Sequence, residues 1–131
     1  MRFVNPLPFV ADVEASKRFY RDGLGLEIAE DHGDFVRFEG GFALHEGTSL
    51  LRTVFGAASP PSEPYGRRNL VLYFESARLE EDFARLAGLA RIVHPIRAEP
   101  WGQRVFRLLD PDGHIVEIGE PQALWGADSD R

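Results

Sequence analysis

The chain has no cysteine among its 131 residues, which excludes disulfides, thiolate catalysis and cysteine-ligated zinc or iron–sulfur centres. It also lacks any run of Lys or Arg, and its net charge is −6, which argues against non-specific binding to nucleic acid or to an anionic membrane. No stretch is long and apolar enough to span a bilayer, and residues 1–6 lack the apolar core of a signal peptide. We therefore expect a cytoplasmic protein.

The composition that remains is that of an ordinary globular domain. Hydrophobic residues make up 44% of the chain and charged residues 27%. The length is that of one domain.

The same layout of residues occurs twice. Residues 5–10 lead into a helix-like stretch that contains Phe19. Sixty-four positions later, residues 69–74 lead into a second such stretch, which contains Phe83. Two copies of one unit place equivalent residues around a pseudo-two-fold axis, so we expect a cavity lined by both halves.

Apolar periodicity and turn residues predict the order β-α-β-β-β in each half. In the first half we predict a strand over 4–10, a helix over 13–20 capped by Asp12, and strands over 26–30, 35–39 and 42–46. In the second half we predict a strand over 69–75, a cap at Ser76, a helix with the stripe Leu79, Phe83 and Leu86, and strands over 91–96, 105–109 and 114–118, the last two joined by the turn 110–113.

The domain boundaries follow from these elements. We predict one domain over 1–131, with a first unit over 3–52, a Pro- and Gly-rich linker over 53–68 and a second unit over 69–121. The tail that carries Trp125 either packs or frays.

Two segments, 12–26 and 106–117, resemble the vicinal oxygen chelate superfamily, which groups glyoxalase I, bleomycin resistance proteins and extradiol dioxygenases. The resemblance implies an α+β fold in which two βαβββ repeats form a curved eight-stranded mixed sheet, with helices on the convex side. It further implies a small-molecule pocket and a homodimer. One such scaffold carries many activities, so the reaction does not follow from the fold.

The resemblance also implies up to four metal-ligand positions, on the first and last strand of each unit. Asn5, His45, Asn69 and Glu117 occupy them, and only Glu117 agrees with the glyoxalase pattern, because both expected histidines are asparagines. Amide oxygens are poor ligands for metals that prefer imidazole. Either a divalent ion (Mn, Mg, Ni or Zn) is held by His45 and Glu117, or there is no metal.

Strand alternation gives an independent prediction of the inward face. It turns Glu117, Arg107, His45 and Arg37 inward, because their apolar neighbours face the helices. Such a face suits a small, partly polar ligand with a carboxylate or phosphate. The apolar wall is predicted to consist of Leu7, Phe9, Val71 and Tyr73.

Each of these residues also has a purely structural interpretation. Glu117 could simply pair with Arg107 or Arg37, and His45 could be a satisfied histidine. Asn5 and Asn69 either bind substrate or serve backbone groups at strand ends. Trp101 forms either a lid over the ligand or a loop anchor. The remaining histidines are predicted to be surface residues: His32, His94 and His114.

Three functions remain open. The first is a metal-assisted lyase or isomerase with His45 and Glu117 as catalytic residues and metal ligands. The alternative is a metal-free binding or sequestration protein, which the loss of both histidines favours. The third is metal-free acid–base catalysis by His45 and Glu117. Ring-cleaving dioxygenase activity is not expected, because its two iron-binding histidines are absent.

Overall fold

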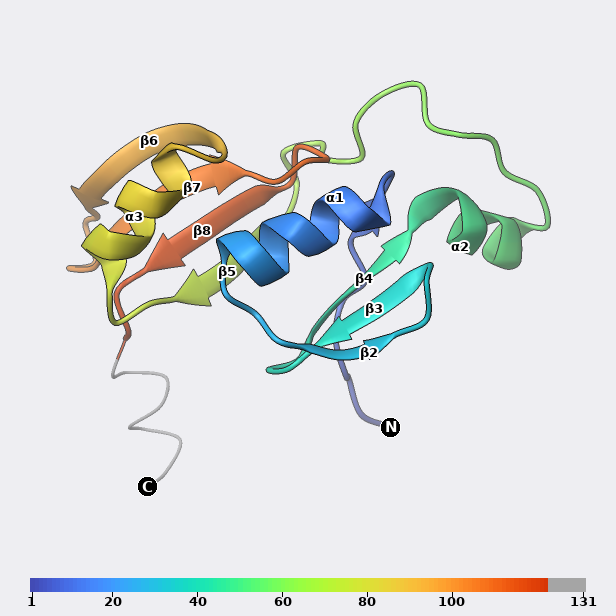
Figure 1. Ribbon diagram of the computed structural model, residues 1–131, viewed down its shortest axis with the longest axis horizontal. Coiled ribbons are helices and arrows are strands. Elements are labelled where there is room, and N and C mark those ends of the chain that lie inside the picture. Colours follow the sequence, from blue (N-terminus) through green and yellow to red (C-terminus); the bar gives the residue numbers. More distant parts are fainter. Residues whose placement is uncertain (123–131) are drawn as a thin grey trace. The chain divides into compact units, whose positions relative to one another are not determined.

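In the computed structural model, which describes residues 1–122, eight strands lie in two four-stranded mixed sheets (Figure 1). The contacts divide the chain into unit 1, residues 1–67 and 111–113, and unit 2, residues 68–110 and from 114 onward. The α+β fold with two repeats is thus confirmed. No helix within residues 1–122 has both the length and the apolar character needed to cross a membrane.

The strands are as follows: β1 (Phe9–Val10), β2 (Ile28–Asp31), β3 (Phe35–Phe38), β4 (Phe42–Glu46), β5 (Val71–Glu75), β6 (Arg91–Ala98), β7 (Arg104–Leu109) and β8 (Ile115–Gly119). The helices are α1 (Val13–Lys17), the π-helical turn η1 (Arg18–Gly23) that continues it, α2 (Gly47–Phe55) and α3 (Leu79–Ala87).

The sheet of unit 1 has the order β1-β4-β3-β2, with β1 parallel to β4 at the edge. The predicted strand over 4–10 is wrong in length, because only two of its residues form the ladder. Pro6 and Pro8 have no N–H to donate, which explains both the edge position and the short strand.

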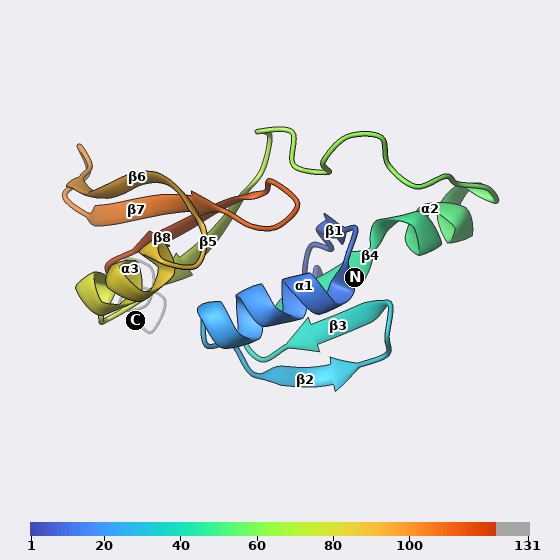
Figure 2. The same cartoon turned by 45° about the horizontal axis from the view of Figure 1, so that its top comes forward.

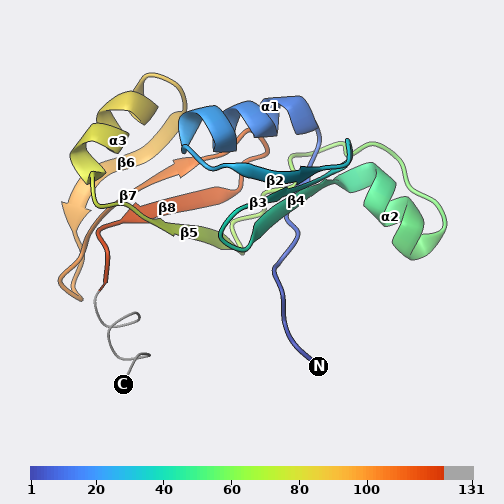
Figure 3. The same ribbon diagram turned by 60° about the horizontal axis from the view of Figure 1, so that its bottom comes forward.

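Helix α1 covers one face of this sheet (Figure 3). Asp12 caps it as predicted, since its Oδ1 accepts a hydrogen bond from the Ala15 N–H at 3.1 Å. In η1 the buried Tyr20 ring packs against the rings of Phe38 and Phe42, with centroids 6.1 and 4.8 Å away. The core of unit 1 therefore lies between α1–η1 and this face of the sheet.

Helix α2 follows β4 directly and was not predicted from the sequence. Glu46 caps it with both carboxylate oxygens, which accept from the backbone N–H groups of Ser49 at 2.7 Å and Thr48 at 3.0 Å. The helix includes residues 53–55, which the sequence assigns to the linker. Its last turn leaves Val54 and Phe55 exposed.

The sheet of unit 2 has the order β5-β8-β7-β6, and α3 packs on one of its faces (Figure 2). The predicted stripe is confirmed: Leu79 and Leu86 are buried, and the Phe83 ring meets Phe106 at 5.1 Å. Ser76 is not the N-cap, which is Arg78. Instead the Ser76 hydroxyl accepts from the Arg78 N–H and donates to an acidic side chain of α3, that of Asp82.

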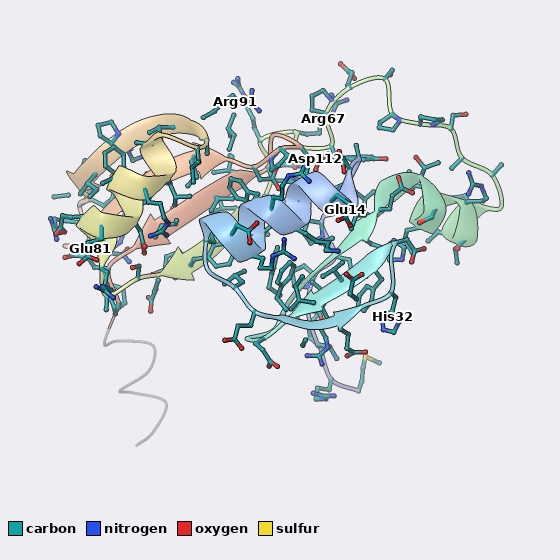
Figure 4. The ribbon with its side chains drawn as sticks, in the orientation of Figure 1. Glu14, His32, Arg67, Glu81, Arg91 and Asp112 are labelled. Carbon is teal, nitrogen blue, oxygen red and sulfur yellow. The ribbon has the colours of Figure 1, made fainter. Side chains whose placement is uncertain are left out.

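The predicted turn at 110–113 is present, and it does more than join two strands. Asp112 lies in this turn (Figure 4). Its carbonyl accepts from the Gly66 N–H at 3.0 Å, and its Oδ1 accepts from the Ala11 N–H at 2.8 Å. Residues 111–113 belong to unit 1 because of these contacts. His114, predicted at the surface, is 7% exposed.

Candidate functional site

Four polar residues form one row across the sheet of unit 2. In the strand register Tyr73 pairs with Glu117, Glu117 with Arg107, and Arg107 with His94. The strand neighbours of Glu117 and Arg107 are buried, and one of them, Phe106, packs on Phe83 of α3, so the row lies on the opposite face, called here the open face of unit 2. Glu117 and Arg107 thus face away from the helix, as strand alternation predicts, and a cavity that they share with unit 1 stays a prediction.

Arg107 is the centre of this row. Its Nε donates to Glu117 Oε1 at 2.8 Å, its Nη1 lies 2.9 Å from His94 Nε2, and its Nη2 lies 3.6 Å from Glu99 Oε2. The Arg107 and Glu117 side chains are only 18% and 15% exposed. A guanidinium has five N–H donors, so Arg107 retains donors for a further acceptor.

The tautomer of His94 follows from its two neighbours. Arginine can only donate, so His94 Nε2 must accept from Arg107 Nη1. His94 Nδ1 then carries the proton and donates to the Pro95 carbonyl at 2.7 Å. His94 in the structure is a neutral imidazole with both nitrogens engaged.

His94 is a site residue that sequence reasoning missed. Regular alternation would put it on the same face as Ile92, which pairs with the buried Leu108. A register shift between Ile92 and His94 turns it to the open face instead. The nearby Pro95 was the only sequence signal of an irregularity in this strand.

Tyr73 joins a second set of hydrogen bonds. Its hydroxyl donates to Glu75 Oε2 at 2.5 Å and accepts from Gln103 Nε2 at 2.8 Å. Burial, together with the Glu75 carboxylate, raises the pKa of Tyr73 to about 12. The Gln103 amide is 2% exposed and occupies the space that a side chain at Gly119 would need.

Trp101 is tied to the same network. Its indole N–H donates to Gln103 Oε1 at 2.7 Å, although the residue is 56% exposed. The next residue, Gly102, has a φ of +89°, which a residue with a β-carbon rarely adopts. This geometry supports the interpretation of Trp101 as a loop anchor.

In unit 1, His45 lies between two aromatic residues. It pairs with Phe9 on β1 and with Phe35 on β3, whose ring centroid is 6.0 Å away. His45 Nδ1 lies 2.9 Å from the Glu46 carbonyl, and its Nε2 has no hydrogen-bond partner within residues 1–122. His45 belongs to unit 1 and Glu117 to unit 2, so a site shared by the two stays a prediction.

Arg37 and Asn5 of unit 1 have local partners. Arg37 Nε donates to Glu30 Oε2 at 2.6 Å, and His32 Nε2 lies 3.2 Å from Glu30 Oε1. Asn5 precedes β1 and donates to the Pro6 carbonyl at 2.9 Å. Asn69 is exposed and precedes β5, which begins at Val71 rather than at residue 69. Neither asparagine lies on the strand predicted for it.

The strand register bears on the correspondence between the two repeats. The 64-residue offset matches Phe9 to Tyr73, and Phe9 pairs with His45 as Tyr73 pairs with Glu117, so His45 is the counterpart of Glu117 along these parallel pairs. The hairpin pairs differ, because Arg37 pairs with Ala43 whereas Arg107 pairs with Glu117. The two hairpins have turns of different length, so Arg37 and Arg107 do not have equivalent partners.

The donor set on the open face of unit 2 does not fit a divalent cation. Glu117 is already bound by the guanidinium of Arg107, and the Nε2 lone pair of His94 points at the same guanidinium. A second cation there would be repelled by the first. Across residues 1–122 there is no group of three or more His, Cys, Asp or Glu side chains arranged to hold a metal ion.

Comparisons with known proteins agree with this fold. A family model described as a glyoxalase-like domain matches residues 3–123. A crystal structure of a protein of unknown function from Agrobacterium tumefaciens is 55% identical, with a TM-score of 0.89, and the match covers 93% of this chain and 95% of that one. No curated protein matches the chain.

Two further solved structures have functional names. A glyoxalase-related enzyme from Fulvimarina pelagi is 27% identical, with a TM-score of 0.72 and coverage of 92% of this chain and 88% of that one. A lactoylglutathione lyase from Agrobacterium tumefaciens is 25% identical, with a TM-score of 0.69 and coverage of 95% and 96%. The chain belongs to the glyoxalase-like domain family, within the vicinal oxygen chelate superfamily that includes glyoxalases, bleomycin resistance proteins and dioxygenases.

Proposed function

We propose that the protein binds a small, partly polar organic molecule without a metal ion. The observation that carries this proposal is the ion pair between Glu117 and Arg107. Glu117 is the one residue that fits the family's metal-ligand pattern, and its carboxylate binds a guanidinium in place of a metal ion. Superfamily members bind small-molecule ligands, and this supports the same role here.

The open face of unit 2 suggests which groups the ligand carries. Arg107 would donate its remaining N–H groups to a carbonyl or carboxylate oxygen. Tyr73 and Val71, which are 42% and 45% exposed, would cover an apolar part of the ligand, and Glu117 would accept from a ligand hydroxyl or amine. Trp101 lies close enough to Tyr73, through Gln103, to report binding by a change in fluorescence.

A second candidate is a lyase or isomerase of the glyoxalase type. The observation in its favour is the 25% identity to a lactoylglutathione lyase over 95% of this chain. His45 and Glu117 would then act together, either as ligands of a divalent ion or as a metal-free acid–base pair. In the acid–base form, the unpartnered His45 Nε2 would move the proton.

The deciding experiment measures metal and ligand binding on the same protein. Elemental analysis after incubation with Mn²⁺, Ni²⁺ and Zn²⁺ is expected to find no stoichiometric metal. A thermal-shift screen of carboxylates and ketones is then expected to give hits that are insensitive to chelator. Stoichiometric metal that is lost in His45→Ala would instead establish the metalloenzyme.

Variants locate the ligand once a hit is found. Arg107→Met is expected to weaken a carboxylate ligand by about ten-fold or more, because it removes a charge-assisted hydrogen bond. The matched control is Arg97→Met, since Arg97 is an exposed arginine of the same sheet whose carboxylate partner is Glu99. Equal loss in both variants would contradict a site at Arg107.

We also propose that the protein forms a homodimer and that it works in the cytoplasm. Exposed apolar side chains in both units support a dimer, among them Phe3 at 81% and Phe55 at 76% exposure.

A further inference from the structure

A pocket of about 400 Å³ lies in unit 1, and all of its lining residues belong to that unit. This size is typical of sites for small organic molecules. The pocket brings together β1, α2 and the segment before β5. Its lining residues are Phe9, Leu51, Pro61, Ser62, Glu63, Pro64, Tyr65 and Arg67.

The walls are aromatic and aliphatic. Phe9 and Tyr65 meet edge to face, with ring centroids 5.7 Å apart and planes at 90°. Leu51 on α2 and the rings of Pro61 and Pro64 complete the apolar lining. Such a combination of one ring edge and one ring face favours a flat, aromatic occupant.

Two of these walls are fixed by one turn. The segment that carries Tyr65 and Arg67 is held by the hydrogen bond from the Gly66 N–H to the Asp112 carbonyl at 3.0 Å. The end of β1 is held by the bond from the Ala11 N–H to the Asp112 side chain at 2.8 Å. A pocket whose walls are fixed in advance loses less entropy when a ligand binds.

The pocket also has two polar groups. The first, the Tyr65 hydroxyl, is buried and has no hydrogen-bond partner within residues 1–122, so it is not open to a molecule in the pocket. The Tyr65 ring and its hydroxyl lie against Gly47, where any β-carbon would overlap them, and the ring is therefore a fixed wall.

Arg67 is the second polar group. It bonds Glu63 at 3.0 Å, but both side chains are more than half exposed, at 58% and 64%. Such a surface pair is weak, so Glu63 can turn into water while Arg67 binds another carboxylate. Arginine matches a carboxylate with two parallel hydrogen bonds.

We propose that this pocket binds a small aromatic carboxylic acid, with its ring against Phe9, Leu51 and Tyr65 and its carboxylate on Arg67. This site goes beyond the proposed function, because no residue of the open face of unit 2 lines it. Of the residues predicted from the sequence to bind substrate, it contains Phe9.

The test is a titration followed by amide NMR, with 2-naphthoate and the uncharged 2-naphthamide as probes. Saturable shifts at residues 9, 51, 62, 63 and 65–67 are expected, with a Kd for 2-naphthoate below about 10 mM. Arg67→Met is expected to weaken 2-naphthoate at least about five-fold and to leave 2-naphthamide nearly unchanged. Arg52→Met, an exposed arginine of α2 outside the pocket, is the matched control and keeps both affinities.

A second pair of variants tests the ring wall. Gly47→Ala is expected to displace the Tyr65 ring and weaken both probes, whereas Tyr65→Phe keeps the ring and should keep both affinities. Absence of saturable binding, shifts centred on Tyr73 and Arg107, or equal effects of Arg67→Met on the two probes would each overturn the proposal. Retained binding in Arg107→Met separates this pocket from the proposed ligand site on unit 2.

Discussion

At the scale of single residues, Tyr73 shows how local surroundings change a side chain's chemistry. Burial and the Glu75 carboxylate raise its pKa from 10.0 to about 12, since both disfavour the phenolate. The folded state therefore keeps a proton that the unfolded state loses between these two values. Stability is expected to fall as the pH rises from about 10 to about 12.

Absorbance at alkaline pH tests this prediction. The chain has three tyrosines. The phenol titration at about pH 12 belongs to Tyr73, so it should be absent from Tyr73→Phe. The variant should also lose most of the stability change over that range. A wild-type difference spectrum in which Tyr73 titrates at its ordinary value would contradict the hydrogen bond to Glu75.

Arg68 has an unusual backbone conformation. It has a φ of +59° and is the one residue other than glycine in that region within residues 1–122. The β-carbon disfavours this conformation, so Arg68→Gly is expected to raise the free energy of unfolding by up to about 1 kcal/mol. Arg68→Ala keeps the β-carbon and should give no gain in urea unfolding; a gain equal to that of glycine would show that backbone strain is not the cause.

At the scale of elements, helix α2 depends on one capping residue. Burial acts to raise the pKa of Glu46, but the backbone N–H groups of Ser49 and Thr48 bind the ionised form, and the net result is a lowered pKa. The capping contribution is therefore complete above the ordinary pKa of 4.5 and is lost as the pH falls below it. Within unit 1, α2 extends from the end of β4 with two exposed apolar residues, so its cap matters more than its packing.

Removing the cap gives a measurable prediction. Glu46→Ala is expected to cost about 1 kcal/mol and to speed amide hydrogen exchange in residues 47–55 selectively. Glu46→Gln keeps an acceptor and should lose the acid dependence while retaining part of the protection. Exchange that is unchanged in Glu46→Ala would mean that α2 is held by contacts other than its cap.

The accuracy of the sequence predictions also differs by element. Helix α3 and the cap Asp12 follow from local patterns, and both are confirmed. Helix α2 was missed, because its sequence is short and rich in Thr, Ser and Gly, residues more typical of a turn. The N-terminal strand was overextended, because the apolar pattern continues through prolines that cannot pair.

At the scale of the whole molecule, the exposed apolar surface predicts self-association. Phe3, Val4 and Phe55 are 81%, 62% and 76% exposed, and burial of such side chains in an interface is favourable. Light scattering after size exclusion is expected to give about twice the chain mass of 14.7 kDa. A double variant, Phe3→Ser with Phe55→Ser, should shift the mass toward that of one chain; a wild-type mass of one chain at about 100 μM would contradict the dimer.

The sequence by itself determined the repeat, the α+β fold, and which side of each strand faces the helices, because these depend on local periodicity and composition. It also placed Glu117, Arg107 and Tyr73 on one face, where strand pairing sets them in a single row. Only the tertiary structure decided the partners of that row. A bulge in β6 brings His94 to Arg107, and hairpin turns of different length give Arg37 and Arg107 different partners, Ala43 and Glu117. Register between strands is fixed by contacts far apart in the chain, so local patterns do not contain it.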